Sequence, residues 1–255
     1  MSVFSKYSTY YNLLYKDKDY AGESAYVAGK IYRSAPQTKS VLELGCGTGL
    51  HAALLAGKGW RVHGIDLSDS MIAAAEANRA GLPDDVASLL SFARGDVRNY
   101  RFNDCFDVVI SLFHVASYQT SNKDLDDFMA TAAAHLQKGG VFVFDFWYGP
   151  AVLTKLPVVR IKRLDDESIR LVRIAEPVLH PNLNRVDVNY QVLITDKSTG
   201  LVEEVKETHP MRYLFLPEVA LLLENHGFVS WMAEEWMTGR APDSDTWGVC
   251  VVAIR

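Results

Sequence analysis

The chain of 255 residues has few cysteines, no long apolar run and no excess of positive charge. Its three cysteines, Cys46, Cys105 and Cys250, are widely spaced and include no C-x-x-C pair, which argues against a disulfide framework and a zinc site. No stretch reaches the roughly 18 apolar residues of a membrane helix, and the first residues lack the apolar core of a signal peptide. A formal net charge of -5 argues against a nucleic-acid-binding surface. We therefore expect a cytoplasmic protein without a membrane or nucleic-acid partner.

The apolar content is sufficient for one sizeable core. Apolar residues make up 49% of the chain, which is typical of a globular protein of this length. No dense cluster of carboxylates or histidines indicates a metal, so we expect none.

The most informative stretch is Val41-Leu42-Glu43-Leu44-Gly45-Cys46-Gly47-Thr48-Gly49-Leu50. It predicts a short apolar strand, a glycine-rich turn and the start of a helix. Glycines at every second position allow a sharp turn and let a ligand touch the backbone. Free N–H groups at the helix start would face that turn. This unit is typical of a nucleotide-binding site, although a purely structural turn and a nicotinamide site are alternatives.

A second strand ends in Asp66, which follows Gly47 by 19 residues. An acidic residue at that offset can accept hydrogen bonds from both hydroxyl groups of a ribose. A solvated strand end is the alternative for this residue. Ser68 or Asp69 is expected to cap the next helix, over 70–80.

Short apolar runs alternate with helical patterns up to residue 147, as expected for parallel strands covered on both faces. After Gly149-Pro150, turn compositions separate four strand-like runs, which predicts an antiparallel sheet. We predict an α/β fold with a doubly wound, mostly parallel seven-stranded sheet and an antiparallel β insert after strand five. The expected strands are 41–44, 61–66, 88–93, 106–111 and 141–147, then 158–164, 168–177, 185–195 and 201–215 in the insert, and finally 228–236 and 247–254; helices are expected at 124–136 and 217–226, and 138–140 is expected to form a turn.

Seven of the twelve tyrosines lie in the first 35 residues. Tyr7, Tyr11 and Tyr15 follow a spacing of four and would share one face of a helix. Such a stripe either packs an N-terminal helix onto the core or forms a lid over a bound cation, because aromatic faces attract positive charge.

The spacing E-x-G-x-G-x-G resembles motif I of class I S-adenosylmethionine-dependent methyltransferases, and the resemblance extends over nearly the whole chain. More narrowly, the chain resembles enzymes that N-methylate the amino group of nucleotide-linked amino-deoxysugars. The matching segments are 11–15, 19–23, 64–68 with Met71, and 144–148. Asn12 departs from this subfamily, which usually has Asp there. Tyr118 stands where the subfamily usually has His, while His114 lies four residues earlier.

The resemblance implies S-adenosylmethionine as the cofactor in a Rossmann-like fold. It places Asp96 at the adenine amino group and the Val97 N–H at a ring nitrogen, although a plain turn residue is the alternative for Asp96. The implied cofactor-binding residues are Tyr11, Tyr15, Glu43, Gly45, Cys46, Gly47, Gly49, Asp66, Leu67, Met71, Asp96, Val97 and Ser111.

His114 is the first candidate base, because a neutral histidine has a suitable unperturbed pKa of about 6.5. Tyr118, His209 and Tyr148 are the next candidates. Packing is the alternative for His114, and a structural role at a strand end is the alternative for His209. Trp147 and Tyr148 either line an acceptor pocket or belong to the core.

Five cations are expected within one hairpin of the insert. A nucleotide-sugar needs cationic partners for its diphosphate, and Arg160 and Arg173 are the candidates, although such clusters are often solvated faces. The five are Arg160, Lys162, Arg163, Arg170 and Arg173.

We therefore predict methyl transfer to a small-molecule acceptor, preferably an amino-deoxysugar nitrogen. The alternatives are a hydroxyl, carboxyl or heteroaromatic nitrogen acceptor, and more remotely a nicotinamide-dependent oxidoreductase. An RNA substrate is disfavoured by the acidic balance and by the absence of an N/D-P-P-Y/F signature. The expected domains are an N-terminal helical lid (1–35), a cofactor-binding core (36–150 and 216–255) and an insert covering the acceptor (151–215), with a homodimer possible.

Overall fold

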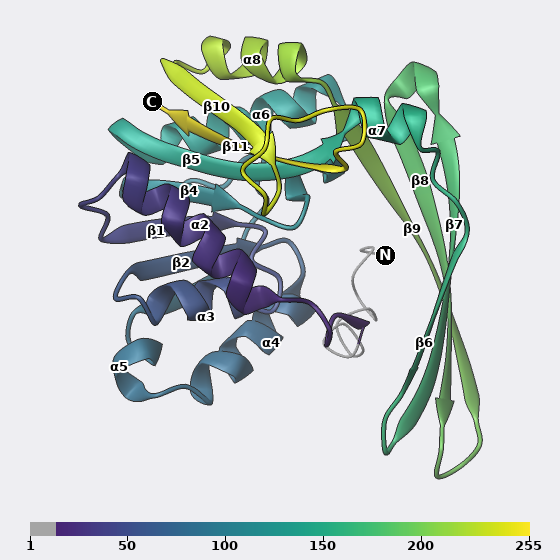
Figure 1. The fold of residues 1–255 in the computed structure, drawn as a ribbon. Coiled ribbons are helices and arrows are strands. Elements are labelled where there is room, and N and C mark those ends of the chain that lie inside the picture. The colour runs from purple at the N-terminus through teal and green to yellow at the C-terminus, as the bar shows by residue number, and fades with distance from the viewer. Residues whose placement is uncertain (1–13) are drawn as a thin grey trace.

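The computed structural model describes residues 14–255, so Tyr7 and Tyr11 lie outside the described residues. Its core is a seven-stranded sheet with helices on both faces (Figure 1). The strand order is β3-β2-β1-β4-β5-β11-β10, in which β11 runs antiparallel to β5 and β10 antiparallel to β11. The core strands are β1 (Ser40–Leu44), β2 (Arg61–Asp66), β3 (Leu90–Arg94), β4 (Phe106–Ser111), β5 (Leu136–Tyr148), β10 (Ser230–Glu235) and β11 (Gly248–Ile254).

Side chains on alternate positions of the core strands build two apolar layers, as strand geometry requires. In β5, Phe142, Phe144 and Phe146 pack on one face, and Val141 and Val143 on the other. The first face is covered by α6 and α8 and the second by α2 and α3. The helices are α2 (Tyr20–Ser34), α3 (Leu50–Ala56), α4 (Asp69–Ala80), α5 (Asp84–Ala87), α6 (Asn122–Ala134), α7 (Gly149–Thr154) and α8 (Leu216–Asn225), with 3-10 turns at Val115–Tyr118 (η1) and Pro181–Leu183 (η2).

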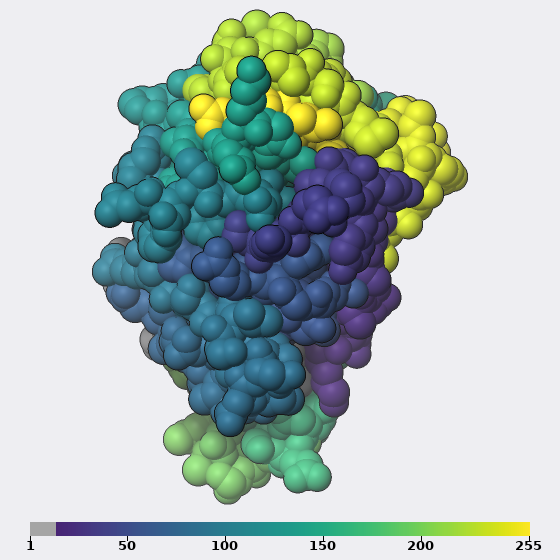
Figure 2. Space-filling view, turned by 90° about the vertical axis from the view of Figure 1, so that its left-hand side faces the viewer, coloured from purple at the N-terminus to yellow at the C-terminus, as the bar shows by residue number. Residues whose placement is uncertain are grey.

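The insert is a four-stranded antiparallel sheet that stands beside the core (Figure 1). It joins the core where the end of β5 pairs with the end of β9, at Trp147–Tyr213 and Tyr148–Leu214. The two hairpin tips of the insert, green in Figure 2, extend beyond the core. The strands are β6 (Arg160–Asp165), β7 (Ile169–His180), β8 (Arg185–Asp196) and β9 (Val202–Leu214).

The inner face of the insert packs against the core through a small apolar cluster. Leu14, just before α2, and Met71 of α4 pack against Leu171, Val192 and Val205 of the insert. Leu14 therefore lies between the core and the insert. No helix among residues 14–255 is both long and apolar enough to cross a membrane.

The predicted fold class and all eleven expected strands are confirmed, and the differences are local. The turn expected at 138–140 is wrong, because β5 already begins at Leu136 and passes through a register irregularity opposite β4. Gly139 takes a positive φ of 82° there. The helix expected over 124–136 begins two residues earlier, because Ser121 and Asp124 form a reciprocal capping box. The short helices α5 and α7 were not predicted.

Two valines provide a test of the core. Val251 of β11 is fully buried, whereas Val229 is 80% exposed. We expect Val251→Ala to lower the free energy of unfolding by about 1.5–3 kcal/mol, because it removes buried apolar surface. Val229→Ala should change it by less than about 0.5 kcal/mol. Urea unfolding of both variants measures the difference, and equal losses would contradict the assigned core.

Candidate active site

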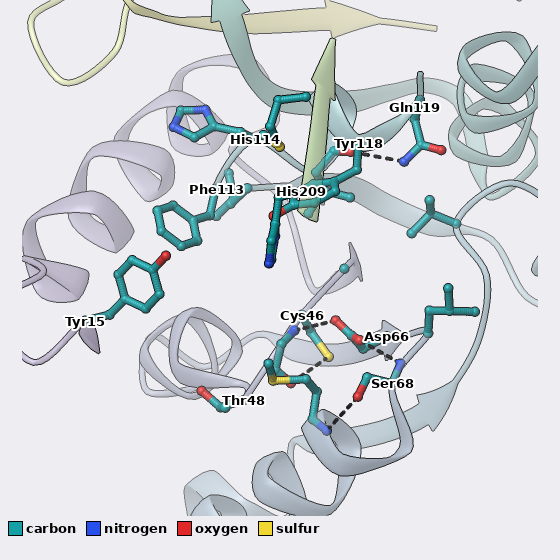
Figure 3. A pocket seen from close by; sticks show the side chains of 18 of the residues that line it. Tyr15, Cys46, Thr48, Asp66, Ser68, Phe113, His114, Tyr118, Gln119 and His209 are labelled. Atoms are coloured by element: carbon teal, nitrogen blue, oxygen red, sulfur yellow. Dashed lines mark hydrogen bonds between the residues drawn. The ribbon is translucent and has the colours of Figure 1, made fainter. Parts of the chain in front are cut away.

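A cavity of about 740 Å³ lies between the carboxyl ends of the core strands and the inner face of the insert. Its floor is the glycine turn after β1, and its opposite wall comes from β6 to β9. The carboxyl ends of parallel strands are where ligands bind in open α/β sheets. Figure 3 shows this cavity from close by, with Asp66 and Cys46 on one side and Tyr118 and His209 on the other.

The glycine turn presents bare backbone to the cavity. Gly45, Gly47 and Gly49 all have a positive φ, between 54° and 81°. The N–H groups of Gly45 and Cys46 both donate to the Ile65 carbonyl at 2.8 Å, which holds the turn against β2. Apart from its two chain neighbours, residues 14–255 place no atom within 4 Å of the position that a Cβ on Gly47 would take. A ligand can therefore approach the Gly47 backbone directly.

Asp66, at the end of β2, is held by two backbone donors. Its carboxylate accepts the N–H of Gly47 at 3.0 Å and the N–H of Ser68 at 2.9 Å. Burial raises the pKa of Asp66, and the backbone hydrogen bonds oppose that shift. Each oxygen keeps a lone pair that a ligand hydroxyl can use.

Asp96 and Val97, after β3, also line the cavity, and Arg98 beside them fixes the carboxylate. The Arg98 guanidinium contacts Asp96 through Nε at 2.9 Å and through its terminal nitrogen at 2.6 Å. The same side chain reaches Asp124 at the start of α6, at 2.9 Å. The hydrogen bonds from Arg98 lower the pKa of Asp96. Asp96 is thus an oriented, ionised acceptor.

The loop after β4 carries two residues in the left-handed region, Phe113 at φ 63° and His114 at φ 64°. Non-glycine residues adopt this conformation at an energetic cost and cluster at functional sites. The buried Asp145 carboxylate accepts the His114 N–H at 3.1 Å, and its Oδ2 lies 2.7 Å from His114 Nδ1. The Phe113 ring meets the Tyr15 ring edge-on at a centroid distance of 5.0 Å. Asp145 therefore holds the loop in its strained form.

On the opposite wall, Tyr118 of η1 meets His209 of β9. Their Oη and Nδ1 atoms lie 2.8 Å apart. The second ring nitrogen of His209 lies 3.3 Å from Glu207 Oε2. Burial raises the pKa of Tyr118 well above its usual value, so this side chain stays protonated at neutral pH.

A buried ionic cluster borders the cavity near the start of α2. Lys18 forms an ion pair with Glu23, and its Nζ lies 3.3 Å from His51 Nε2. The same ammonium lies over the rings of Tyr20 and Phe113, 4.1 and 4.4 Å from their centroids. Burial lowers the pKa of Lys18. Three residues in contact with this cluster, His51, Tyr20 and Phe113, line the cavity. The cluster therefore connects the rim of the cavity with the chain near the start of α2.

Glu43 lies in β1 below the turn and is only 1% exposed. Burial is the main cause that raises its pKa to about 8. Its Oε2 has no hydrogen-bond partner within residues 14–255. Glu43 does not line the cavity, so its contribution to the site runs through the turn that it supports.

Most of the residues predicted for the site surround this one cavity. Four do not line it, for local reasons. The Ser111 hydroxyl donates to the Leu44 carbonyl, Gly49 is packed against Phe92, and Tyr148 packs against the core, while Glu43 is enclosed in β1. Tyr11 lies outside the described residues. The predicted residues that do line it are Tyr15, Gly45, Cys46, Gly47, Asp66, Leu67, Met71, Asp96, Val97, His114, Tyr118, Trp147, Arg160, Arg173 and His209.

Several lining residues were missed by sequence reasoning. The only signals were weak: a histidine in the helix after the glycine turn (α3), and a tyrosine on an alternating strand of the insert. Tertiary packing alone brings them to the cavity. They are His51, Arg98, Phe113, Gln119 and Tyr190.

The residues fit an adenosyl cofactor. The cavity lies within the roughly 300–1,000 Å³ range of small-molecule sites. Gly47 leaves open space for a ligand, Asp66 offers oriented acceptors to a ribose, and Asp96 offers one to an adenine amino group.

Comparison with known proteins agrees with this geometry. A model of the methyltransferase domain matches residues 41–140. The dTDP-3-amino-3,4,6-trideoxy-alpha-D-glucopyranose N,N-dimethyltransferase of Streptomyces venezuelae is 30% identical over 185 residues, covering 71% of this chain and 74% of the relative. The chain belongs to the S-adenosylmethionine-dependent methyltransferases. The dTDP-3-amino-3,6-dideoxy-alpha-D-glucopyranose N,N-dimethyltransferase of Streptomyces fradiae is 29% identical over 189 residues, which cover 74% and 71% of the two chains.

Solved structures share the methyltransferase fold over almost the full length. The crystal structure of Streptomyces venezuelae DesVI has a TM-score of 0.80 and 24% identity, with 98% of each chain covered. The S-adenosylmethionine-bound amino pentose methyltransferase CalS10 from Micromonospora echinaspora has a TM-score of 0.75 and 24% identity, with 96% of each chain covered. The Rossmann-like fold expected from the sequence is thus confirmed. The comparisons favour a methyltransferase over the nicotinamide-dependent oxidoreductase that was the remote alternative.

Substitution of Gly47 tests the floor of the methyltransferase site. We expect Gly47→Ala to weaken S-adenosylhomocysteine binding at least tenfold, about 1.4 kcal/mol, because the added methyl group would point into the cavity. Gly200→Ala is the matched control: Gly200 has a φ of 72° with open space around it, in a surface turn of the insert. Isothermal titration calorimetry measures both affinities. Equal affinity for the Gly47→Ala variant and the wild type would show that the ligand does not lie on the turn.

Glu43 predicts a pH dependence of stability. Its folded-state pKa of about 8 exceeds the ordinary value of 4.5, so its contribution to stability is fully present below pH 4.5 and is lost as pH rises through 8. The loss amounts to at most about 1.4 kcal/mol per pH unit. We expect Glu43→Gln to remove this loss, so that the variant gains stability relative to wild type between pH 5 and 8.5. Urea unfolding at several pH values measures the gain, with the exposed Glu224→Gln as control; parallel curves for wild type and Glu43→Gln would contradict the assignment.

Proposed function

We propose that the protein transfers a methyl group from S-adenosylmethionine to the amino group of a nucleotide-linked amino-deoxysugar. Family membership establishes the methyl donor. The names of the two Streptomyces relatives, both N,N-dimethyltransferases of dTDP-linked amino sugars, support the acceptor class. The structural observation that carries the proposal is the two-walled cavity, with the glycine turn on one side and a polar, partly cationic insert face on the other.

The core wall would hold the donor. Asp66 would accept the ribose hydroxyls, and Asp96 with the Val97 N–H would bind the adenine. S-adenosylmethionine supplies a methyl carbon on a positively charged sulfur. The rings of Tyr15 and Phe113, in edge contact at the cavity, are suited to favour that charge.

The insert wall would hold the acceptor. A departing thioether needs no proton, so the main task of the protein is to align the acceptor with the methyl carbon. Such alignment contributes up to roughly 7–11 kcal/mol in well-oriented reactions. Trp147, Tyr190 and Tyr118 line the insert side and provide flat surfaces for a sugar ring.

The alternation of the insert strands divides the five predicted cations between two faces. Arg160, Lys162 and Arg173 lie on the inner face, because each shares its strand face with a residue packed toward the core, Leu164 or Leu171. Arg160 and Arg173 line the cavity, and the Arg173 guanidinium lies 5.0 Å from the Tyr190 ring centroid. We propose that these two arginines bind the diphosphate, because Arg matches phosphate geometry with paired donors.

Three variants test the diphosphate site. We expect Arg160→Ala and Arg173→Ala each to raise the KM for the acceptor by about tenfold and to leave S-adenosylhomocysteine affinity unchanged. Arg163→Ala is the control, because Arg163 belongs to the outer face of the same hairpin and does not line the cavity. Steady-state kinetics measures KM. Wild-type KM in both cavity variants would remove the diphosphate site.

The function itself is tested by a tritiated-methyl transfer screen. The substrates are the dTDP-linked amino sugars named for the relatives, their hydroxyl analogues and simple heteroaromatic amines. We expect label on the amino sugars. Label on the hydroxyl analogues alone would replace the proposal by a sugar O-methyltransferase. The cytoplasmic location, the homodimer and the division into 1–35, 36–150 with 216–255, and 151–215 stay predictions.

A further inference from the structure

The inner face of β9 carries two polar side chains where apolar ones are expected. Positions 205, 207, 209 and 211 alternate with outward-facing residues, and Val205 and Met211 are buried apolar residues. Between them stand Glu207, whose side chain is 10% exposed, and His209, at 3%. Burying a carboxylate and an imidazole costs free energy that Val or Leu would avoid. The pair therefore needs an explanation beyond folding.

Glu207, His209 and Tyr118 form one continuous line of hydrogen bonds that ends in the cavity. Tyr118 Oη lies 2.8 Å from His209 Nδ1, and His209 Nε2 lies 3.3 Å from Glu207 Oε2. A protonated tyrosine donates to Nδ1, which places the histidine proton on Nε2, where Glu207 accepts it. Tyr118 and His209 thus each have a donor and an acceptor role, and Glu207 ends the line as an acceptor.

We propose that Tyr118, His209 and Glu207 conduct a proton from the acceptor amine to solvent, an inference that rests on the proposed function. The ammonium form of the acceptor gives a proton to Tyr118 Oη while Tyr118 gives its own to His209 Nδ1. The Nε2 proton of His209 passes to Glu207 and then to water. The freed amine lone pair forms the N–C bond as the C–S bond of the donor breaks, and that electron pair stays on sulfur. One proton is released for each methyl group transferred.

His114, the first candidate from the sequence, is less suited to this role. Its Nδ1 lies 2.7 Å from the buried Asp145, and its backbone is held in the left-handed region by the same carboxylate. Figure 3 shows the His114 ring turned away from the pair formed by Tyr118 and His209. We therefore assign His114 the role of fixing the loop after β4 through its contacts with Asp145.

The surroundings of His209 define which charges act on it. Tyr118 faces it from η1, Glu207 from its own strand, and the Tyr190 ring of β8 meets it edge-on at 4.9 Å. The Arg173 guanidinium of β7 lies over the Tyr190 ring, 5.0 Å from its centroid. Glu207 is the carboxylate in contact with the imidazole, so it favours the protonated histidine that the path requires.

The first experiment measures the pH dependence of kcat with dTDP-3-amino-3,6-dideoxyglucose and saturating S-adenosylmethionine. We expect Tyr118→Phe and His209→Gln each to lower kcat at least tenfold at pH 7. Their activity should recover at a pH above the amine pKa, where the acceptor arrives without its extra proton. A loss that persists at high pH would assign both side chains to positioning and overturn the path. Full loss in His114→Gln with high-pH rescue would assign the proton transfer to His114.

The second experiment needs no acceptor and so separates this inference from the proposed function. The His209 ring is observed by nitrogen NMR at pH 7 in the protein with bound S-adenosylhomocysteine. We expect Glu207→Gln to move the His209 Nε2 resonance away from its wild-type position, since the Glu207 carboxylate contacts that nitrogen. Glu204→Gln, on the outer face of the same strand, is the matched control. A His209 Nε2 resonance that is unchanged in Glu207→Gln would refute the coupling even if amine methylation is confirmed.

Discussion

The site depends on one buried carboxylate that accepts two backbone N–H groups. Asp66 connects the turn after β1, through Gly47, with the start of α4, through Ser68. The Ser68 hydroxyl in turn accepts the Met71 N–H and caps α4. Because burial disfavours the charged form of Asp66, these donors offset part of the cost of placing it there. A single side chain therefore links the glycine turn with the start of α4 at the cavity floor.

The opposite wall follows a different principle. The core wall is built from strand ends and loops, whereas the insert wall is the face of an antiparallel sheet whose residues alternate between cavity and solvent. One-residue alternation decides that Arg173 and His209 face the cavity while Arg170 and Thr208 do not. Under the proposed function, changes at inner positions would alter the acceptor without disturbing the donor site, since function depends on sites rather than on the fold.

Sequence reasoning was sufficient where local pattern decides the structure. The spacing of Gly45, Gly47 and Gly49 with Asp66 identifies the floor of the cavity because both the turn and the offset are local features. Long-range packing is not encoded locally, which is why Arg98 and Tyr190 were missed. Ser111 was expected among the cofactor-binding residues, but a serine at a strand end can face a ligand or its own sheet. Its hydroxyl donates to the Leu44 carbonyl, so it faces the sheet. The turn expected at 138–140 failed because two glycines also fit an irregular strand beside β4.

The two walls of the cavity bear on the presence of Tyr118 at a position where a histidine was expected. A buried tyrosine with a raised pKa cannot act alone as a base near neutral pH, because its phenolate is too costly. It can hand on a proton only if a better acceptor touches its oxygen. His209 provides that acceptor from β9, and Glu207 would stabilise the resulting charge. The imidazole that the loop after β4 lacks at position 118 is thus supplied by the insert.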